Sequence, residues 1–354
     1  MKKLLPIFII TILLYLGMIY ISASLSNYDV QSCKIIGELT LSGKSVYPTP
    51  ANIRNPYLPL FLYLEAGTLF LSNITSIPQM VLMKFFYIFF HLLSVYCAYI
   101  LSKKNRKVTL FYAINPISLL ITAYHGQFDI MPLSLILFSI ILIQKKRYPL
   151  LLILLGCAVT LKTWPILFIV PFLRRIQKKY WYILLIPPTF FVIFYSFLFH
   201  SSLLSIARVL LTYQGVSGIW GLGMALSFMS SSKLFLFIYK LFFVFGLLLF
   251  SIKQKKTTLI EEVSRLILFF FIFTPGFGLQ WFLWLVPFLF ISKKPYIFSL
   301  FIPLFITICI AYASWIFPQA IKTSSVSLVL MSTFFFIFLY TLYVEVISRR
   351  NEHR

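Results

Sequence analysis

Long apolar runs separated by short basic clusters dominate this sequence. The runs are continuous and do not alternate with a period of two, so they predict helices and rule out the strands of a membrane barrel. A backbone in lipid must satisfy its own hydrogen bonds, which also favours helices. The fold class is therefore predicted as all-α and polytopic, with about twelve membrane segments, several of them shorter than the ~20 residues of a full span. The predicted segments are residues 4–23, 80–101, 108–123, 130–143, 148–160, 164–173, 180–199, 233–252, 264–276, 281–291, 296–316 and 325–347.

Composition and charge support a membrane protein. Hydrophobic residues make up 60% of the 354 residues and charged residues 11%, against roughly 45–50% and 25% in soluble domains. The net charge of +23 could indicate a nucleic-acid binder. The Lys and Arg residues, however, form short clusters between apolar runs, which is typical of cytoplasmic loops. These clusters lie at residues 2–3, 103–107, 145–147, 174–179, 253–256, 293–294 and 349–350.

The basic clusters also predict the topology. The first helix runs outward as a retained helix, and residues 24–56 form a long first outer loop. If residues 57–72 and 80–101 both crossed the membrane, the cluster at 103–107 would lie outside, so we expect 57–72 to be an interfacial helix. Two short runs within 148–173 predict a shallow hairpin that brings Lys162 toward the outer half of the membrane. We find no internal repeat and no soluble domain, so residues 1–354 are predicted to form a single integral-membrane domain with both termini cytoplasmic.

The few acidic residues indicate where chemistry could occur. The chain has eight, and both of its aspartates follow an outward-going helix. Asp29 could cap the next helix or be solvated, or it could act as a general base on a hydroxyl. Asp129 could cap the helix that begins at Ile130. Together with His125 and Gln127 it could instead bind a polar ligand.

Isolated cations and one late motif add further candidates. Lys162 is costly in an apolar setting and could hold a phosphate or pair with a carboxylate, unless it snorkels to an interface. Arg54 and Arg208 are expected in outer loops, where they could bind phosphate or be solvated. Gln280 and Trp281 could line a binding site, although tryptophans collect at membrane interfaces anyway.

Cofactor motifs are lacking in the sequence. There is no Walker motif and no usual Gly-rich phosphate loop, and the four cysteines have no metal-ligand spacing. We therefore predict no cofactor and no metal site, with a divalent-metal requirement left open. If the protein is an enzyme, the donor of the group that it transfers must reach the site from the lipid or the outer compartment. A lipid-phosphate-linked substrate meets that requirement.

The order of several short motifs resembles the GT-C superfamily of integral-membrane glycosyltransferases, and is most similar to its bacterial mannosyltransferase-like branch. The resemblance covers residues 1–290, and the helices of 291–354 are variable in such families. It rests on the aspartate in the first outer loop followed by Gly43-Lys44-Ser45-Val46-Tyr47-Pro48, Arg54-Asn55-Pro56-Tyr57-Leu58-Pro59, Asn115-Pro116, His125-Gly126-Gln127-Phe128-Asp129, Lys162-Thr163-Trp164-Pro165 and Gln280-Trp281-Phe282-Leu283-Trp284.

The resemblance implies an inverting transferase in the cytoplasmic membrane of a bacterium, with its active site on the extracytoplasmic side. It would move mannose or another hexose from a polyprenyl-phosphate donor to a lipid-linked or surface glycan. Asp29 would be the general base. The leaving phosphate would be stabilised by Lys162, Arg54 and Arg208, and Asp129, His125 and Gln127 would orient the sugar or the acceptor.

One departure and two rivals remain. Many GT-C members carry two acidic residues in the first loop, whereas Val30 follows Asp29 here. That difference disfavours the branches that carry the pair and puts a metal requirement in doubt. A transporter or flippase of lipid-linked saccharides is the main alternative. It should place ionisable residues near mid-membrane, where Lys84, Lys162 and Lys240 are the candidates. A membrane polymerase or ligase of another fold should carry its large outer loop late in the chain.

Overall fold

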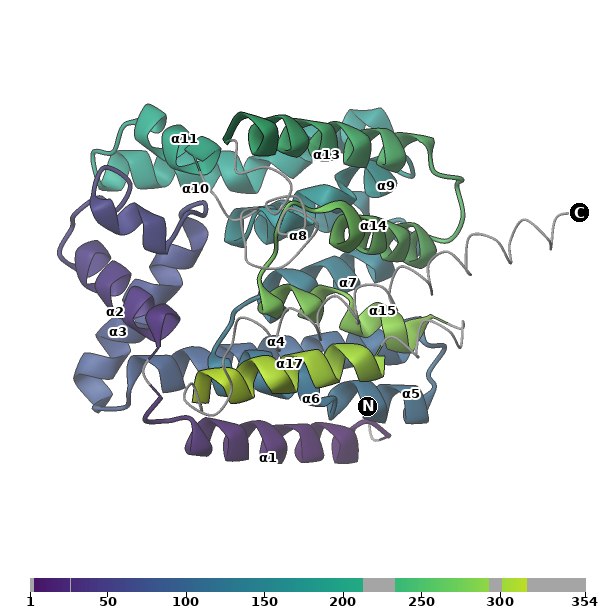
Figure 1. Ribbon diagram of the computed structural model, residues 1–354, viewed down its shortest axis with the longest axis horizontal. Helices are drawn as coiled ribbons and strands as arrows, with labels where there is room; N and C mark the ends of the chain where they lie inside the picture. The colour runs from purple at the N-terminus through teal and green to yellow at the C-terminus, as the bar shows by residue number, and fades with distance from the viewer. Residues whose placement is uncertain (1–2, 26, 213–232, 293–300, 317–354) are drawn as a thin grey trace, which may run out of the picture. The chain divides into compact units, whose positions relative to one another are not determined.

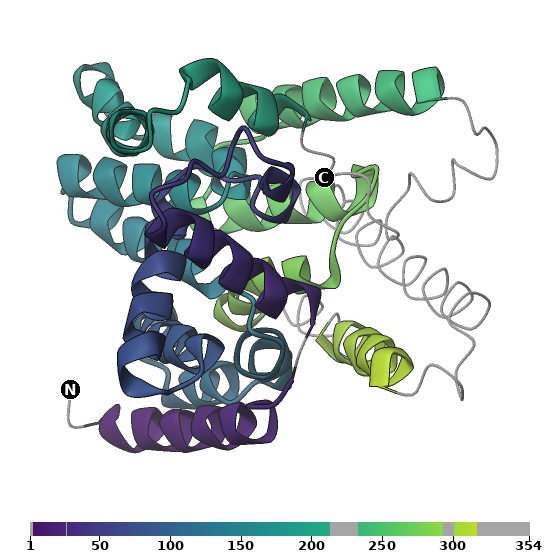
Figure 2. The ribbon, with the colours of Figure 1, turned by 90° about the vertical axis from the view of Figure 1, so that its left-hand side faces the viewer.

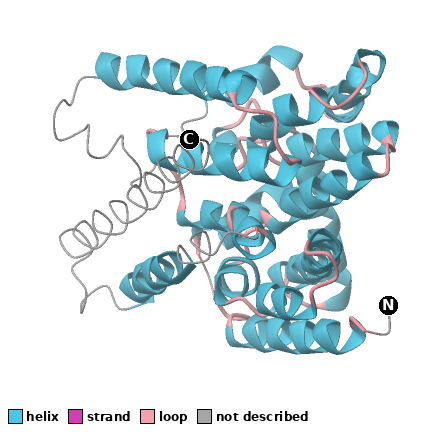
Figure 3. Cartoon of the chain, turned by 90° about the vertical axis from the view of Figure 1, so that its right-hand side faces the viewer, coloured by secondary structure: helices cyan, strands magenta, loops and turns pink. Residues whose placement is uncertain are grey.

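The computed structural model describes residues 3–25, 27–212, 233–292 and 301–316, and this part of the chain is all-helical, without a strand (Figure 3). The all-α prediction is confirmed for these residues. The chain divides into two compact units, Met1–Gly215 and Val216–Arg354, which we describe separately. The predicted single domain, with a boundary at residue 290, stays a prediction.

The first unit contains most of the described helices. In this unit η1, η3 and η4 denote short 3-10 helices, and η2 denotes a π-helix. In chain order the elements are α1 (Leu5–Ile21), α2 (Tyr28–Leu41), η1 (Pro50–Arg54), α3 (Leu60–Thr75), α4 (Gln79–Leu101), α5 (Arg106–Ala113), α6 (Pro116–Ser118), η2 (Leu119–His125), α7 (Ile130–Gln144), α8 (Tyr148–Leu161), η3 (Trp164–Phe168), α9 (Ile169–Leu173), η4 (Lys178–Leu185), α10 (Ile186–Leu198) and α11 (Leu203–Thr212).

The second unit has fewer described elements. They are α13 (Lys233–Lys253), α14 (Leu259–Phe273), the 3-10 helix η5 (Leu279–Trp284), α15 (Val286–Ile291) and α17 (Phe301–Ile316). The aromatic rings of α14 and η5 pack together, with Phe270 5.5 Å from Trp284 between ring centroids. The last predicted span, residues 325–347, lies outside the described residues.

Four helical stretches in the described residues are long and apolar enough to cross a membrane, as expected for a membrane protein. They are Gln79–Leu101, Arg106–His125, Lys178–Leu198 and Leu234–Lys253, and each overlaps a span predicted from the sequence. Other predicted segments form apolar helices of 10–17 residues, among them α1, α7 and α8. The stretch that was expected to be interfacial forms one of these shorter helices, α3, and its place at the membrane interface stays a prediction.

The first unit has a polar end and a basic end. Nζ of Lys84, near the start of α4, donates to Oγ of Ser22 at the end of α1, at 2.7 Å, so the two helices run in opposite directions (Figure 1). The basic residues 103–107 follow the far end of α4, and residues 145–147 form the turn between α7 and α8. Asp29 and residues 125–129 therefore lie at the end opposite these basic clusters, and the assignment of this end to the outer side stays a prediction.

Helices α2 and α3 pack against each other near the polar end, where α1 ends and α4 begins (Figures 1 and 2). Asn27 caps α2, because its Oδ1 accepts a hydrogen bond from the Val30 amide at 2.9 Å. A small apolar core joins this pair to α10: Tyr47 lies edge-on to Tyr195 at 5.1 Å between ring centroids. This packing holds the long first outer loop against the helices.

Candidate functional site

Asp29 lies in the first turn of α2 and contacts residues 125–127, at the end of η2. Its Oδ2 accepts hydrogen bonds from Nε2 of His125 at 2.9 Å and from Nε2 of Gln127 at 2.7 Å. The Asp29 side chain is 44% exposed, whereas that of His125 is 12% exposed. Asp29 thus neither caps α2, which Asn27 does, nor stands free in solvent. Two fixed donors orient a carboxylate that remains accessible.

The local backbone explains how His125 and Gln127 reach the same carboxylate. The π-helix η2 ends at His125 and is followed by Gly126, whose φ of +90° is a left-handed conformation that favours glycine. A Cβ at this position would lie 2.8 Å from Sδ of Met80 on α4. The chain therefore turns tightly against α4, which brings side chains 125 and 127 to one point.

Asp129 and Lys162 form a second, buried pair beside this turn. Nζ of Lys162 lies 2.7 Å from Oδ2 of Asp129, and the side chains are 4% and 0% exposed. The Asp129 side chain makes no capping hydrogen bond to α7. The Lys162 side chain is too deeply buried to reach a membrane interface, which excludes snorkelling. Lys162 follows the last residue of α8 in an extended conformation, which turns its side chain toward α7.

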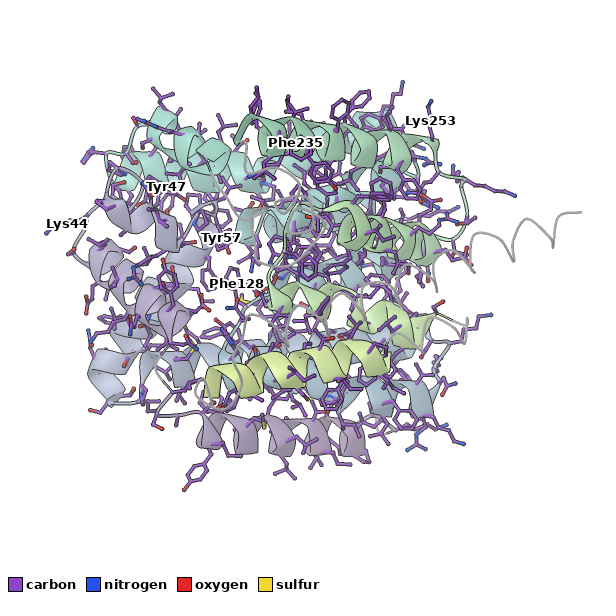
Figure 4. The ribbon with its side chains drawn as sticks, in the orientation of Figure 1. Lys44, Tyr47, Tyr57, Phe128, Phe235 and Lys253 are labelled. Atoms are coloured by element: carbon purple, nitrogen blue, oxygen red, sulfur yellow. The ribbon has the colours of Figure 1, made fainter. Side chains whose placement is uncertain are left out.

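Two aromatic rings complete the surroundings of Lys162. Its Nζ lies 4.5 Å from the ring centroid of Phe128 and 5.2 Å from that of Tyr57, distances at which a cation is attracted to an aromatic face. The two rings meet edge to face at 5.5 Å, and Figure 4 labels both. Phe61 of α3 stacks on Phe128 at 3.7 Å. The first outer loop, α3 and α8 thus meet at this pair.

Arg54 lies against α2 close to Asp29. Its guanidinium carbon is 4.5 Å from the ring centroid of Tyr28, and Nη1 donates to Oγ of Ser32 at 3.1 Å. The residue is half-buried. Because Tyr28 directly precedes Asp29, the Arg54 guanidinium packs on the first turn of the helix that carries the carboxylate.

Arg208 is not brought to this cluster, and the other two predicted residues lie in the second unit. Arg208 was expected in a loop but lies on helix α11, where it is exposed, because residues 203–212 have a strongly amphipathic pattern. Gln280 and Trp281 belong to η5 in the second unit. There Trp281 stacks on Trp284 at 4.9 Å, within its own unit. Their proposed part in binding stays a prediction.

Sequence reasoning missed several residues that support the cluster. Asn27, Tyr57 and Phe128 were quoted only within motifs or passed over, although an Asn just before a helix is a recognisable capping signal. Lys84 was noticed only as a candidate for a transporter. Its bond to Ser22 joins residues 62 positions apart, so no local pattern could reveal it.

The buried acid Glu65 lies on α3 and contacts the segment that precedes this helix. Its Oε2 accepts a hydrogen bond from Nδ2 of Asn55 at 3.1 Å, and only 2% of the residue is exposed. Burial raises the pKa of the Glu65 carboxyl well above its usual range, against the opposing effect of hydrogen bonds from Cys33 and Asn55. Glu65 therefore fixes the loop that carries Arg54 and Tyr57.

The geometry permits proton transfer and binding of a polar ligand. Asp29 is an oriented and accessible carboxylate, and the nearby cations could offset negative charge on a ligand. Among the described residues there is no group of three or more His, Cys, Asp or Glu side chains that could hold a metal ion. In comparisons with known proteins, no protein-family model and no curated protein matched this chain.

Proposed function

We propose that the protein is a membrane glycosyltransferase of the GT-C type. It moves mannose or another hexose from a polyprenyl-phosphate donor to a lipid-linked or surface glycan acceptor. The reaction takes place at the outer face of a bacterial cytoplasmic membrane, within a fold of about twelve membrane segments. The observation that carries the proposal is the half-exposed carboxylate of Asp29, held by His125 and Gln127 at the end of the helices opposite the basic clusters.

In this reaction the acceptor hydroxyl attacks the anomeric carbon of the donor sugar. Asp29 takes the hydroxyl proton as a new C–O bond forms, and the bond from the anomeric carbon to the phosphate oxygen breaks. The polyprenyl phosphate leaves with the bonding electron pair, and a single displacement inverts the configuration. Hydrogen bonds from His125 and Gln127 to Oδ2 hold the carboxylate in position.

The leaving phosphate gains negative charge, which fixed cations stabilise. Arg54 suits this role best, because within the described residues it forms no ion pair and it contacts Tyr28, the neighbour of Asp29 in α2. The charge of Lys162 is already matched by Asp129, so Lys162 contributes mainly by shaping the site. Arg208 lies on exposed helix α11 and is a weaker candidate.

A transporter or flippase of lipid-linked saccharides is the second candidate. The observation that favours it is the buried Asp129–Lys162 pair, since paired ionisable residues within a helical membrane protein often line a transport path. Asp29 argues against it, because a transporter does not need an accessible carboxylate oriented by two donors at the membrane surface.

The proposal is tested with purified protein in lipid vesicles and a glycan-lipid acceptor. One reaction receives polyprenyl-phosphate mannose or polyprenyl-phosphate glucose, and the other receives the corresponding sugar nucleotides. We expect labelled sugar to reach the acceptor only from a polyprenyl-phosphate donor. Transfer from a sugar nucleotide without polyprenyl lipid would refute the donor assignment. Movement of the lipid-linked sugar across the bilayer without transfer would favour the transporter.

A further inference from the structure

Lys84 is a buried cation that the proposed chemistry does not use. It lies in α4, in one of the four long apolar helices, and only 2% of it is exposed. Its Nζ donates to Oγ of Ser22 at 2.7 Å and to the backbone carbonyl of Tyr124 at 2.9 Å. A lysine in a membrane helix is expensive and is by default a functional residue. A methionine would fill this place at less cost.

The carbonyl that Lys84 binds belongs to the end of η2, where backbone carbonyls lack helical partners. Two successive carbonyls there accept hydrogen bonds from side chains of other elements, and a third lies beside the Ser22 hydroxyl, whose single proton goes to the Met18 carbonyl at 2.7 Å. Oγ of Ser22 lies 3.3 Å from the carbonyl of Ala123, Nζ of Lys84 binds that of Tyr124, and Nδ2 of Asn27 lies 3.4 Å from that of His125. A cation is also favoured at the negative end of a helix.

These contacts fix the backbone on which the two donors to Asp29 are mounted. His125 directly follows the carbonyl that Lys84 binds. At Gly126, a Cβ would lie 3.3 Å from Cε of the Lys84 side chain. The Gln127 amide then bonds back to the carbonyl of Ile121 at 3.0 Å. Lys84 is thus packed against the turn that sets the positions of the His125 and Gln127 side chains.

We propose that Lys84 is a positioning residue for the Asp29 site, acting through the end of η2. The expected fall in kcat rests on the proposed transferase function, whereas the expected loosening of residues 124–127 does not. Lys84 touches no substrate. It holds residues 124–127 so that His125 and Gln127 meet the same carboxylate oxygen.

The kinetic test is a double-mutant cycle between Lys84 and His125. We expect Lys84→Met to lower kcat between about 10- and 100-fold, as a misplaced catalytic group does, with little change in the donor KM. In a His125→Ala background the same change should lower kcat several-fold less, because one of the two donors through which Lys84 acts is gone. Lys240→Met, in the apolar helix α13, is the matched control and should leave kcat unchanged.

An equal loss of kcat from Lys84→Met in both backgrounds would overturn the proposal, since it would mean a general effect on the fold. If Lys84→Met does not yield folded protein, Ser22→Ala replaces it in the cycle, because this variant removes one of the two acceptors of the ammonium. A loss of kcat from Ser22→Ala that is smaller in the His125→Ala background would support the proposal, and an equal loss in both backgrounds would overturn it. The loss in the wild-type background should be smaller than that from Lys84→Met.

Amide hydrogen exchange tests the structural part without substrate. Lys84→Met should speed exchange of the Gln127 amide by about tenfold or more and leave the amides of α7 unchanged. Unchanged exchange at residue 127 would overturn the proposal. If the wild type transfers no sugar while Lys84→Met still speeds this exchange, the proposed function fails and the positioning role stands.

Discussion

Nζ of Lys162 lies 2.7 Å from Oδ2 of Asp129, and both side chains are removed from solvent. These two residues are 33 positions apart, at the end of α8 and just before α7. Removing one partner of a buried ion pair leaves the other charge without compensation, which typically costs about 3–5 kcal/mol. The pair therefore predicts both a stability effect and a kinetic effect.

Lys162→Met is expected to lower the thermal unfolding temperature of the detergent-solubilised protein strongly. The double variant Lys162→Met/Asp129→Leu should recover most of that loss, because it removes both charges and fills the space with apolar side chains. Lys34→Met is the matched control. It removes an exposed lysine whose Nζ is 4.0 Å from Glu38, and it should leave the unfolding temperature unchanged.

Recovered stability should not bring back sugar transfer, because the double variant lacks the polar pair beside the Asp29 site. A double variant that transfers sugar at the wild-type rate would show that the pair has only a structural part. Equal unfolding temperatures for Lys162→Met and the wild type would contradict its burial.

Arg54→Lys keeps the positive charge of Arg54 but loses the planar guanidinium that lies over Tyr28. A lysine cannot bind a phosphate through two parallel hydrogen bonds. We expect the KM for the polyprenyl-phosphate donor to rise about tenfold, with a smaller effect on kcat. Tyr28→Phe keeps the aromatic face and should leave KM unchanged. An unaltered KM in Arg54→Lys would remove Arg54 from phosphate binding.

The helical class and the long apolar helices of the described residues could be predicted from the sequence. The positions of the basic clusters were enough to predict that Asp29 and Asp129 lie on the same side of the membrane. Lys and Arg are enriched in short cytoplasmic loops, so each basic cluster marks the cytoplasmic end of a helix. Hydrophobic runs also predicted the four long apolar helices to within a few residues. These inferences depend on local pattern, which a single sequence carries.

Side-chain pairing could not be predicted in this way. Asp29 and His125 are 96 positions apart, and their contact depends on how α2 packs near the end of η2. The sequence offered pairing with a carboxylate as one option for Lys162 and could not choose the partner. It also missed helix α11, because Arg208 was expected in an outer loop.

Glu65 predicts a pH dependence of stability. Helix α3 is not one of the four long apolar helices, and burial raises the pKa of its Glu65 carboxyl. The folded state therefore holds a proton that the unfolded chain releases above its pKa of about 4.3. Below the unfolded-state pKa, Glu65 makes its full contribution to the free energy of unfolding. That contribution is lost as the pH rises toward the folded-state pKa.

Glu65→Gln keeps the shape of the side chain and an acceptor for Asn55 but cannot ionise. Its unfolding temperature should match that of the wild type near pH 4 and exceed it increasingly from pH 5 to pH 8. Glu38→Gln, at an exposed carboxylate of α2, is the control and should show no such trend. A constant difference between Glu65→Gln and the wild type across this pH range would contradict the buried protonated acid.

The central claim, that Asp29 is the general base of sugar transfer, is tested most directly by the transfer rate of Asp29→Asn in isolated membranes. Asn keeps the size of the side chain but cannot take a proton, so the rate should fall by about 10²–10⁴-fold at unchanged expression. Glu38→Gln, which neutralises an exposed carboxylate on the same helix, should transfer at the wild-type rate. Transfer by Asp29→Asn within a few-fold of the wild-type rate would contradict the claim.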